Sequence, residues 1–174
     1  MERREVNACL IRMQKGDHEA FAALYEGCKR GVFAVLYPYY HSYSDTEDAM
    51  QSVFLRVKEN ILKYRPDTDA RSWLLTVARN YALNDIKRKK REELTEDSVL
   101  ERLSVGSPIP EGGAFDALNR ALNEEERRVV VLHVFWGYKH RETAKLLSMP
   151  LGTVTSKYKT AIAKMRKFLE EVAT

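Results

Sequence analysis

Residues 150–169 have the sequence PLGTVTSKYKTAIAKMRKFL, with five basic side chains and no acidic one. Apolar residues recur in it every three or four positions, which is the spacing of an amphipathic α-helix. They are Leu151, Val154, Tyr158, Ala161, Met165 and Phe168. Helical geometry turns another set outward, small and polar at first and basic at its end: Thr153, Ser156, Thr160, Ala163 and Lys167. The segment is therefore predicted to be a helix with an exposed face that bears no acid.

A shorter helix is predicted immediately before this one, over residues 139–147. Ser148 and Met149 are expected to form a tight turn, and Pro150 stands where the first turn of a helix tolerates proline. A short helix, a brief turn and a longer helix with a polar N-terminal half are the layout of a DNA-binding helix-turn-helix. Many ordinary helical hairpins also have a polar outer face. The absence of acids from residues 150–169 is what favours DNA.

The charge of the chain is segregated, although its net value is only +4. Residues 71–91 contain seven basic residues and a single acid, Asp85. Residues 92–117 reverse the sign, with seven acids and one base, Arg102. Two cationic segments joined by an anionic one indicate a protein that holds a polyanion at two points, and nucleic acid is the first hypothesis.

The predicted fold class is all-α, with two small helical domains joined by a flexible linker. Apolar residues recur at helical rather than strand spacing almost throughout the 174 residues. The linker is predicted because glycine and proline gather between the two halves, at Gly106, Pro108, Pro110, Gly112 and Gly113. The predicted boundaries are 1–93 for the first domain, 94–116 for the acidic linker and 117–174 for the second domain.

Turn and cap signals place the helices of the first domain. Asp17 is predicted to cap the start of one helix, and Pro38 to end it, because proline lacks the N–H that a helix interior needs. A tyrosine-rich loop is expected over residues 37–43, with its rings either partly buried or exposed for stacking. Ser44 is expected to begin the next helix with a capping box.

Two further helices of this domain combine an apolar stripe with a polar one. Residues 45–61 have the apolar stripe Met50, Val53, Phe54, Val57 and Ile61, and their polar face is either solvated or protein-binding. Residues 71–91 have the apolar stripe Leu74, Val77, Ala78, Tyr81 and Ile86. A second stripe on that helix is uncharged and polar at first and basic at its end: Thr76, Asn80, Asn84, Lys87 and Arg91.

Cysteine, histidine and hydropathy signals favour no other class of site. Cys9 and Cys28 have no second sulfur or histidine at metal-ligand spacing, so buried reduced thiols are expected, with no metal, no cofactor and no catalytic dyad. The longest apolar run, residues 129–136, is too short to span a bilayer, and the N-terminus lacks the apolar core of a signal peptide. The expectation is a cytoplasmic protein without membrane insertion.

Four segments resemble, in matching order, the extracytoplasmic-function (group 4) sigma factors of bacterial RNA polymerase, in the sigma-70 family. They are Lys15 to Phe21 followed by Leu24 and Tyr25, Asp45 to Val57, Ser72 to Arg91, and Pro150 to Lys157. The resemblance covers nearly the whole chain. It implies that residues 1–93 form sigma region 2, which binds core polymerase and the −10 element, and that residues 117–174 form sigma region 4, which binds the −35 element.

The resemblance also implies the site residues. Core polymerase contacts are expected at Asp48, Gln51, Ser52 and Leu55. Contacts to the −10 element and to melted DNA are expected at Thr76, Arg79, Asn80, Asn84, Lys87, Arg88 and Arg91, with Asn80 helping to capture a flipped base. Contacts to the −35 element are expected at Thr153, Thr155, Ser156, Lys157, Lys159, Thr160, Lys164 and Lys167.

The implied partners are promoter DNA, the β′ clamp and β flap of bacterial core RNA polymerase, and an anti-sigma factor. The chain departs from the family pattern at several positions. Serine stands at position 52 where the family usually has glutamate, and Thr155, Thr160 and Ile162 stand where it commonly has arginine. Fewer −35 contacts, or a different −35 sequence, are expected as a result.

The function predicted is that of a sigma factor, not an enzyme, which recognises both promoter elements and promotes DNA melting. Linking two weak DNA-binding modules makes the second contact intramolecular. The alternative is an autonomous helix-turn-helix regulator, which would not need a partner-binding helix over residues 45–61. A nuclease using the acids near Asp45 is disfavoured, since carboxylates at a helix N-terminus are explained by the helix dipole.

Overall fold

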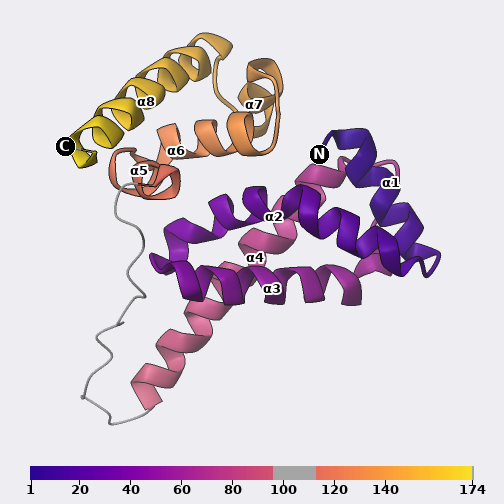
Figure 1. Ribbon diagram of the computed structural model, residues 1–174. Helices are drawn as coiled ribbons and strands as arrows, with labels where there is room; N and C mark the ends of the chain where they lie inside the picture. The colour runs from indigo at the N-terminus through magenta and orange to yellow at the C-terminus, as the bar shows by residue number, and fades with distance from the viewer. Residues whose placement is uncertain (96–112, 174) are drawn as a thin grey trace. The chain divides into compact units, whose positions relative to one another are not determined.

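The computed structural model describes the backbone of residues 1–95 and 113–173 and the side chains of residues 1–91 and 113–173. All the regular structure in these ranges is helical, which confirms the predicted all-α class. The chain divides into two compact units, Met1–Ser107 and Pro108–Thr174 (Figure 1). The predicted linker, 94–116, lies mostly outside the described residues, and the domain boundaries stay a prediction. None of the helices described is long and apolar enough to cross a membrane.

The first unit is a helical bundle. Its elements are α1 (Arg3–Gln14), α2 (His18–Tyr40), α3 (Tyr43–Glu59), the short 3-10 helix η1 (Ile61–Lys63) and α4 (Ala70–Thr95). Helix α2 packs against α1, α3 and α4, and both α1 and α3 also contact α4. The core between them is apolar and includes Leu24, Leu36, Val53, Phe54 and Leu74. In Figure 1 the C-terminal end of α4 projects past α2 and α3.

The junction between α2 and α3 differs from the prediction. Asp17 caps α2 as predicted, but Pro38 lies inside this helix and does not end it. Only the last turn of α2 follows the proline, so one missing backbone hydrogen bond is tolerated there. The helix ends at His41, which has a left-handed φ of 54° and donates its N–H to the Tyr37 carbonyl at 2.9 Å.

The expected tyrosine-rich loop is therefore wrong in its extent. It shrinks to His41 and Ser42, because the preceding tyrosines remain helical and α3 begins at Tyr43. Tyr37 is 2% exposed and stacks on Phe33 with ring centroids 5.6 Å apart. Of the two alternatives predicted for the tyrosine rings, burial is the one that applies to Tyr37. Ser42, not Ser44, is the N-cap of α3, since its hydroxyl accepts the Asp45 N–H at 3.3 Å.

The apolar stripe of α4 is also shorter than predicted. Leu74 and Ala78 are buried, but Ile86 is 37% exposed, so its assignment to the core is wrong. The buried residue at that end of the helix is Asp85, at 8% exposure. Helical geometry explains the exchange, because Asp85 continues the line of Ala78 and Ala82 whereas Ile86 lies a further 100° round the helix.

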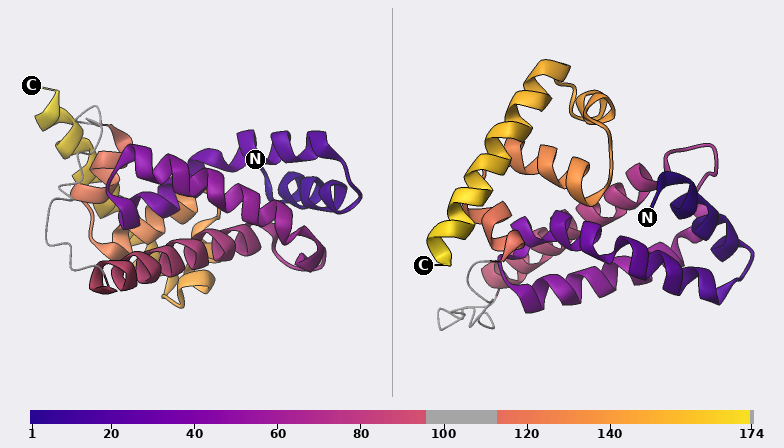
Figure 2. Two further views of the ribbon diagram at one scale, coloured as in Figure 1. Left: turned by 90° about the horizontal axis from the view of Figure 1, so that it is seen from below. Right: turned by 45° about the horizontal axis from the view of Figure 1, so that its top comes forward.

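The second unit has a small core around its last helix. Its elements are α5 (Ala114–Arg120), α6 (Glu124–Val130), the π-helical turn η2 (Val131–Phe135), α7 (His140–Leu147) and α8 (Leu151–Val172). Helix α8 packs against α5, α6 and α7 (Figure 2). Val129, Ala144 and Val154 form the buried cluster that joins α6, α7 and α8. The turn between α7 and α8 contains Ser148, whose φ of 52° ends α7 as predicted from the sequence.

Both cysteines lie in the core of the first unit. Cys9 and Cys28 are free and buried, as predicted. Burial raises the pKa of Cys28 to about 11, so its thiol stays protonated near neutral pH.

Candidate nucleic-acid and polymerase interface

The outward face of α4 has a continuous exposed stripe. Thr76, Asn80, Asn84, Lys87 and Arg91 are all exposed, as the sequence predicts, and Arg79 is exposed on the flank of the stripe. The Thr76 hydroxyl donates to the Ser72 carbonyl at 2.8 Å. The amides of Asn80 and Asn84 have no hydrogen-bond partner within the described part of the chain. Amides in this state have both donors and acceptors available for a ligand.

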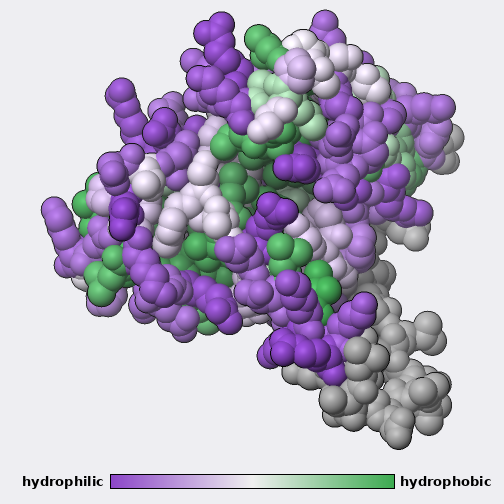
Figure 3. Space-filling model, turned by 180° about the vertical axis from the view of Figure 1, so that it is seen from behind, coloured by the Kyte–Doolittle hydropathy of each residue, from purple (hydrophilic) through white to green (hydrophobic). Residues whose placement is uncertain are grey.

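Hydrophilic side chains gather where α4 ends. Figure 3 shows them beside the grey residues that follow the helix. They come from five consecutive basic residues, Lys87 to Arg91, all of which are exposed. This end of α4 therefore has a cluster of exposed basic side chains.

Arg88, one of the predicted −10 contacts, is held by a carboxylate of its own unit. Its Nη2 lies 2.7 Å from Oδ1 of Asp85, and Nζ of Lys89 lies 3.2 Å from Oδ2. The Tyr40 hydroxyl donates to the same Oδ2 at 3.0 Å. Arg88 makes this pair because it follows Asp85 by three residues on the same side of the helix, and its predicted contact with the −10 element stays a prediction.

The surroundings lower the pKa of Asp85 and raise the pKa of Tyr40. Burial by itself would raise the pKa of Asp85, but the hydrogen bonds from Arg88, Lys89 and Tyr40 outweigh it and lower the pKa. Burial raises the pKa of Tyr40, and its bond to the Asp85 carboxylate raises the pKa further. Asp85 is therefore charged and Tyr40 neutral near neutral pH.

The outward face of α8 also agrees with the prediction in its first half. Thr153, Ser156, Lys159, Thr160 and Lys167 are exposed. Thr155 is half-buried, and its hydroxyl donates to the Leu151 carbonyl at 3.0 Å. No acid from residues 151–169 interrupts this face. Small hydroxyl groups near the start of the helix can approach base edges, and lysines further along can approach phosphates.

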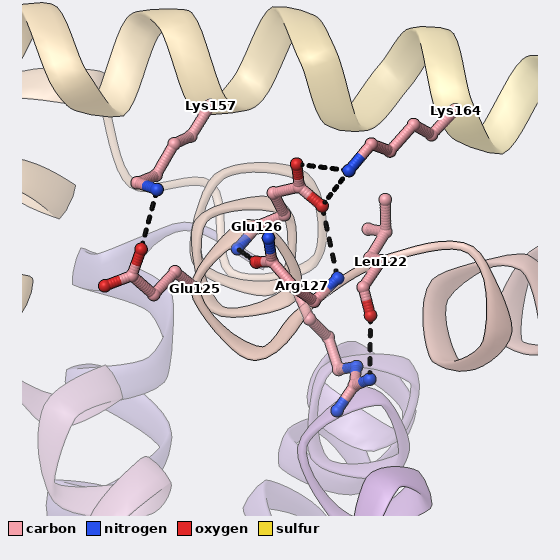
Figure 4. Close-up of polar contacts among 7 residues, drawn as sticks. Leu122, Glu125, Glu126, Arg127, Lys157 and Lys164 are labelled. Carbon is pink, nitrogen blue, oxygen red and sulfur yellow. Dashed lines mark hydrogen bonds and ion pairs between the residues drawn. The ribbon is translucent and has the colours of Figure 1, made fainter.

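Two lysines of α8 form ion pairs with carboxylates of α6. Lys157 Nζ lies 2.6 Å from a carboxylate oxygen of Glu125, and Lys164 Nζ lies 2.7 Å from Oε1 of Glu126 (Figure 4). Both were predicted to contact DNA. Each follows a buried residue of α8 by three positions, so helical geometry turns it toward α6.

The Glu126 carboxylate joins three parts of the second unit. It accepts from Lys164 Nζ at 2.7 and 2.9 Å and from the Asn123 N–H at 3.1 Å. Asn123 in turn accepts the Glu126 N–H at 2.9 Å, which completes a capping box at the start of α6. Burial opposes the charge, but the bonds from Lys164 and Asn123 lower the pKa of Glu126.

Arg127 extends this framework to α5. Its guanidinium donates to the carbonyls of Leu118 at 3.1 Å and of Asn119 at 3.0 Å. It also donates to the Leu122 carbonyl at 3.0 Å (Figure 4). These carbonyls lie in and just after the last turn of α5, where a helix lacks backbone partners. The orientation of α8 therefore depends on contacts from α6 and α5. The contacts of Glu126 and Arg127 were not predicted from the sequence, although the Asn-x-x-Glu spacing at 123–126 is a recognisable capping signal.

The predicted polymerase-binding face of α3 is exposed. Asp48 and Gln51 are exposed, Ser52 is half-buried, and Leu55 is 57% exposed. Leu62 of η1, which the sequence analysis did not select, is 80% exposed. Two exposed leucines seven residues apart could have been recognised as apolar residues that fall outside the buried stripe.

The ion pair of Glu126 gives a testable prediction. Glu126→Gln should lower the free energy of unfolding of the second unit by about 1–3 kcal/mol, the usual value of a hydrogen bond to a charged group. Glutamine can still complete the capping box, so the change removes the charge alone. Because the folded-state pKa is lowered, the loss should be complete above the ordinary pKa of 4.5 and should vanish as pH falls through the lowered pKa.

Glu125→Gln is the matched control. Glu125 is 54% exposed, so its pair with Lys157 should be worth at most about 1 kcal/mol. Urea unfolding followed by the fluorescence of Trp136, with Trp73 changed to phenylalanine, reports on the second unit. An equal loss for the two variants would contradict the role assigned to Glu126.

Comparisons with known proteins agree with this geometry. Residues 24–92 match the family model of Sigma-70 region 2, and residues 113–165 match that of Sigma-70 region 4. The chain is 27% identical to the ECF RNA polymerase sigma factor SigK of Mycolicibacterium vanbaalenii, over 95% of this chain and 89% of the relative. It is 25% identical to the ECF RNA polymerase sigma factor SigW of Bacillus subtilis, over 92% of this chain and 95% of that protein.

Two solved structures share the fold. CnrH, in complex with the cytosolic domain of CnrY, aligns with a TM-score of 0.60 and 19% identity over 96% of this chain and 98% of its own. RpoE from Bartonella quintana, in complex with the anti-sigma factor NepR, aligns with a TM-score of 0.57 and 18% identity over 86% of this chain and 96% of its own. The two family models together cover most of the chain, and the chain belongs to the extracytoplasmic-function sigma factors of the sigma-70 family, non-enzymatic initiation factors of RNA polymerase that contain regions 2 and 4.

Proposed function

We propose that this sigma factor divides promoter recognition between its two units. In this division, residues 1–93 bind core polymerase and the −10 element, residues 94–116 form a tether, and residues 117–174 bind the −35 element. The observation that carries the proposal is that each unit has one exposed helical face, on α4 or α8, with hydroxyl, amide and basic groups together. Each face alone offers few contacts, and joining them makes the second contact intramolecular.

The −10 surface is the outward stripe of α4. Thr76, Asn80 and Asn84 supply uncharged polar groups, and Arg79, Lys87 and Arg91 supply positive charge. Asn80 is proposed to hold a base that has left the stack, because its amide offers both a donor and an acceptor to a Watson–Crick edge. Such a contact is available only after the duplex opens, so this stripe is proposed to promote melting as well as binding.

The −35 surface is the exposed face of α8. Thr153, Ser156 and Thr160 are proposed to approach base edges in the major groove, while Lys159 and Lys167 bind phosphates. Thr155 lies at the margin of this surface, because it is half-buried. Lys157 and Lys164 are left out, since both are engaged by α6 carboxylates.

The polymerase-binding surface is the exposed face of α3. Asp48, Gln51, Ser52 and Leu55 are proposed to bind the β′ clamp, and the second unit is proposed to bind the β flap. The proposed place of action is the cytoplasm, where these partners and promoter DNA are found. An anti-sigma factor is proposed as a further partner, because structures of similar fold contain CnrY and NepR as partners of CnrH and RpoE.

The α3 surface gives the next prediction. The double change Asp48→Ala, Leu55→Ala should weaken core polymerase binding by roughly tenfold to a hundredfold, as for interface residues worth about 1–3 kcal/mol. Both side chains are exposed, so the free energy of unfolding should change by no more than about 0.5 kcal/mol for each. Fluorescence titration of the labelled chain with core polymerase measures the affinity.

Glu47→Ala is the control for this experiment. Glu47 is exposed on the same helix but points about 100° away from Asp48. It should leave the affinity unchanged. Loss of binding in the control, or full binding by the double variant, would refute the assigned face.

The α8 surface separates base recognition from phosphate binding. Ser156→Ala combined with Thr160→Ala should change the preferred −35 sequence, because these side chains face the base edges. Lys159→Ala should weaken binding to all sequences alike and reduce the slope of log K against log salt concentration by about 0.9. Selection from a randomised −35 library, with the holoenzyme, measures the first effect, and salt titration measures the second.

Lys164→Ala is the matched lysine control, because its ammonium group is engaged by Glu126. It should lower stability while leaving the salt slope unchanged. The assignment fails if the serine and threonine double variant selects the parental −35 sequence, or if Lys164→Ala and Lys159→Ala change the slope equally.

A further inference from the structure

Asp85 differs in charge and in burial from the basic residues around it on α4. It is the single acid among residues 71–91, and it is 8% exposed while the five basic residues that follow at 87–91 are exposed. A carboxylate in a cationic helix weakens the attraction of that helix for DNA phosphates. An alanine would suffice to continue the buried line of Ala78 and Ala82, so packing alone does not explain an acid here.

Both carboxylate oxygens of Asp85 are occupied. Arg88 Nη2 lies 2.7 Å from Oδ1, and Oδ2 accepts from the Tyr40 hydroxyl at 3.0 Å and from Lys89 Nζ at 3.2 Å. Tyr40 also contacts the cation, since Lys89 Nζ lies 5.1 Å from the centroid of its ring. The tyrosine thus binds the anion through its hydroxyl and a cation through its ring face.

The cations of this cluster are not buried with their partner. The side chains of Arg88 and Lys89 are 62% and 50% exposed. Each still has N–H groups that could donate to a phosphate. The Asp85 carboxylate beside them offsets part of their positive charge, so each attracts a phosphate less strongly than an unpaired cation would. Lys87, in contrast, has no ion-pair partner in residues 1–91, so no carboxylate of this range offsets its charge.

We propose that Asp85 is a specificity-determining residue, which neutralises Arg88 and Lys89 so that α4 binds DNA less through phosphates and more through the polar groups of its stripe. Phosphate contacts carry no sequence information, and they supply almost all of non-specific affinity. Withholding two of them lowers non-promoter binding more than promoter binding. The bond from Tyr40 to this carboxylate joins α4 to α2 and is not needed for the neutralisation. This inference rests on the proposed role of α4 in DNA binding.

The test is the salt dependence of DNA binding by the holoenzyme. Affinities for a promoter duplex and for a duplex without promoter motifs are measured from about 50 to 200 mM salt, the range over which phosphate contacts change affinity strongly. Asp85→Asn should make the slope steeper by about 1 to 2 and should make the fall in affinity across this range about tenfold larger. The ratio of promoter to non-promoter affinity should decrease.

Tyr40→Phe separates this role from simple anchoring of α4 to α2. The change removes the hydroxyl but leaves the carboxylate and both cations, so the salt slope should stay as in the parent even if thermal stability falls. Asparagine at position 85 can still accept from Tyr40. If Asp85→Asn and Tyr40→Phe both lower thermal stability and Asp85→Asn leaves the salt slope unchanged, the role of Asp85 is purely structural. That result would overturn the proposal.

Arg88→Ala supplies a test that leaves Asp85 intact. In the parent it should change the slope by less than about 0.3, and in the Asp85→Asn background it should reduce the slope by about 0.9. Lys87→Ala is the matched control and should reduce the slope by about 0.9 in both backgrounds. Equal effects of Arg88→Ala and Lys87→Ala in the parent would overturn the proposal. A slope insensitive to Lys87→Ala would overturn the role of α4 in DNA binding, and this inference with it.

Discussion

A lysine or arginine that is bound by a carboxylate of its own domain attracts a phosphate less strongly, because the carboxylate offsets part of its positive charge. This effect acts in both units. Asp85 holds Arg88 and Lys89 on α4, and Glu126 holds Lys164 on α8. In each case the carboxylate is buried and also receives a hydrogen bond from a second element or a cap, from Tyr40 or from Asn123. Some of the cations on each helix are thereby paired within the protein, although their side chains remain partly exposed.

This pairing explains how a modestly charged chain can contact DNA selectively. Phosphate binding supplies affinity without sequence information, whereas base edges and unpaired bases are distinguished by hydroxyl and amide groups. The exposed faces of α4 and α8 place such groups beside basic side chains, and the two units are linked in one chain. In the proposed division of promoter recognition, selectivity arises from two weak contacts made together.

Helical periodicity allowed the fold and the outward faces to be predicted from the sequence. The stripes of α4 and of the first half of α8 are exposed as predicted, because side-chain direction follows from position along a helix. Helical periodicity does not give the contacts between helices. The carboxylate partners of Lys157 and Lys164, and the bond from Tyr40 to Asp85, could be identified only once the helices were placed. The pair of Arg88 with Asp85 lies within α4 at a spacing of three residues and could have been recognised from the sequence. The predictions for Pro38 and Ser44 were wrong for local reasons. A helix tolerates proline in its last turn, and Ser42, two residues before Ser44, is the N-cap of α3.

Transcription from a library of random promoter templates, by purified core polymerase with and without this chain, tests the central claim most directly. The account predicts that transcripts depend on the chain, and that the selected templates share two separate sequence motifs at a constant spacing, each of which is needed. Selection of a single motif, or transcription that is unchanged when the chain is omitted, would contradict the division of promoter recognition between two linked units.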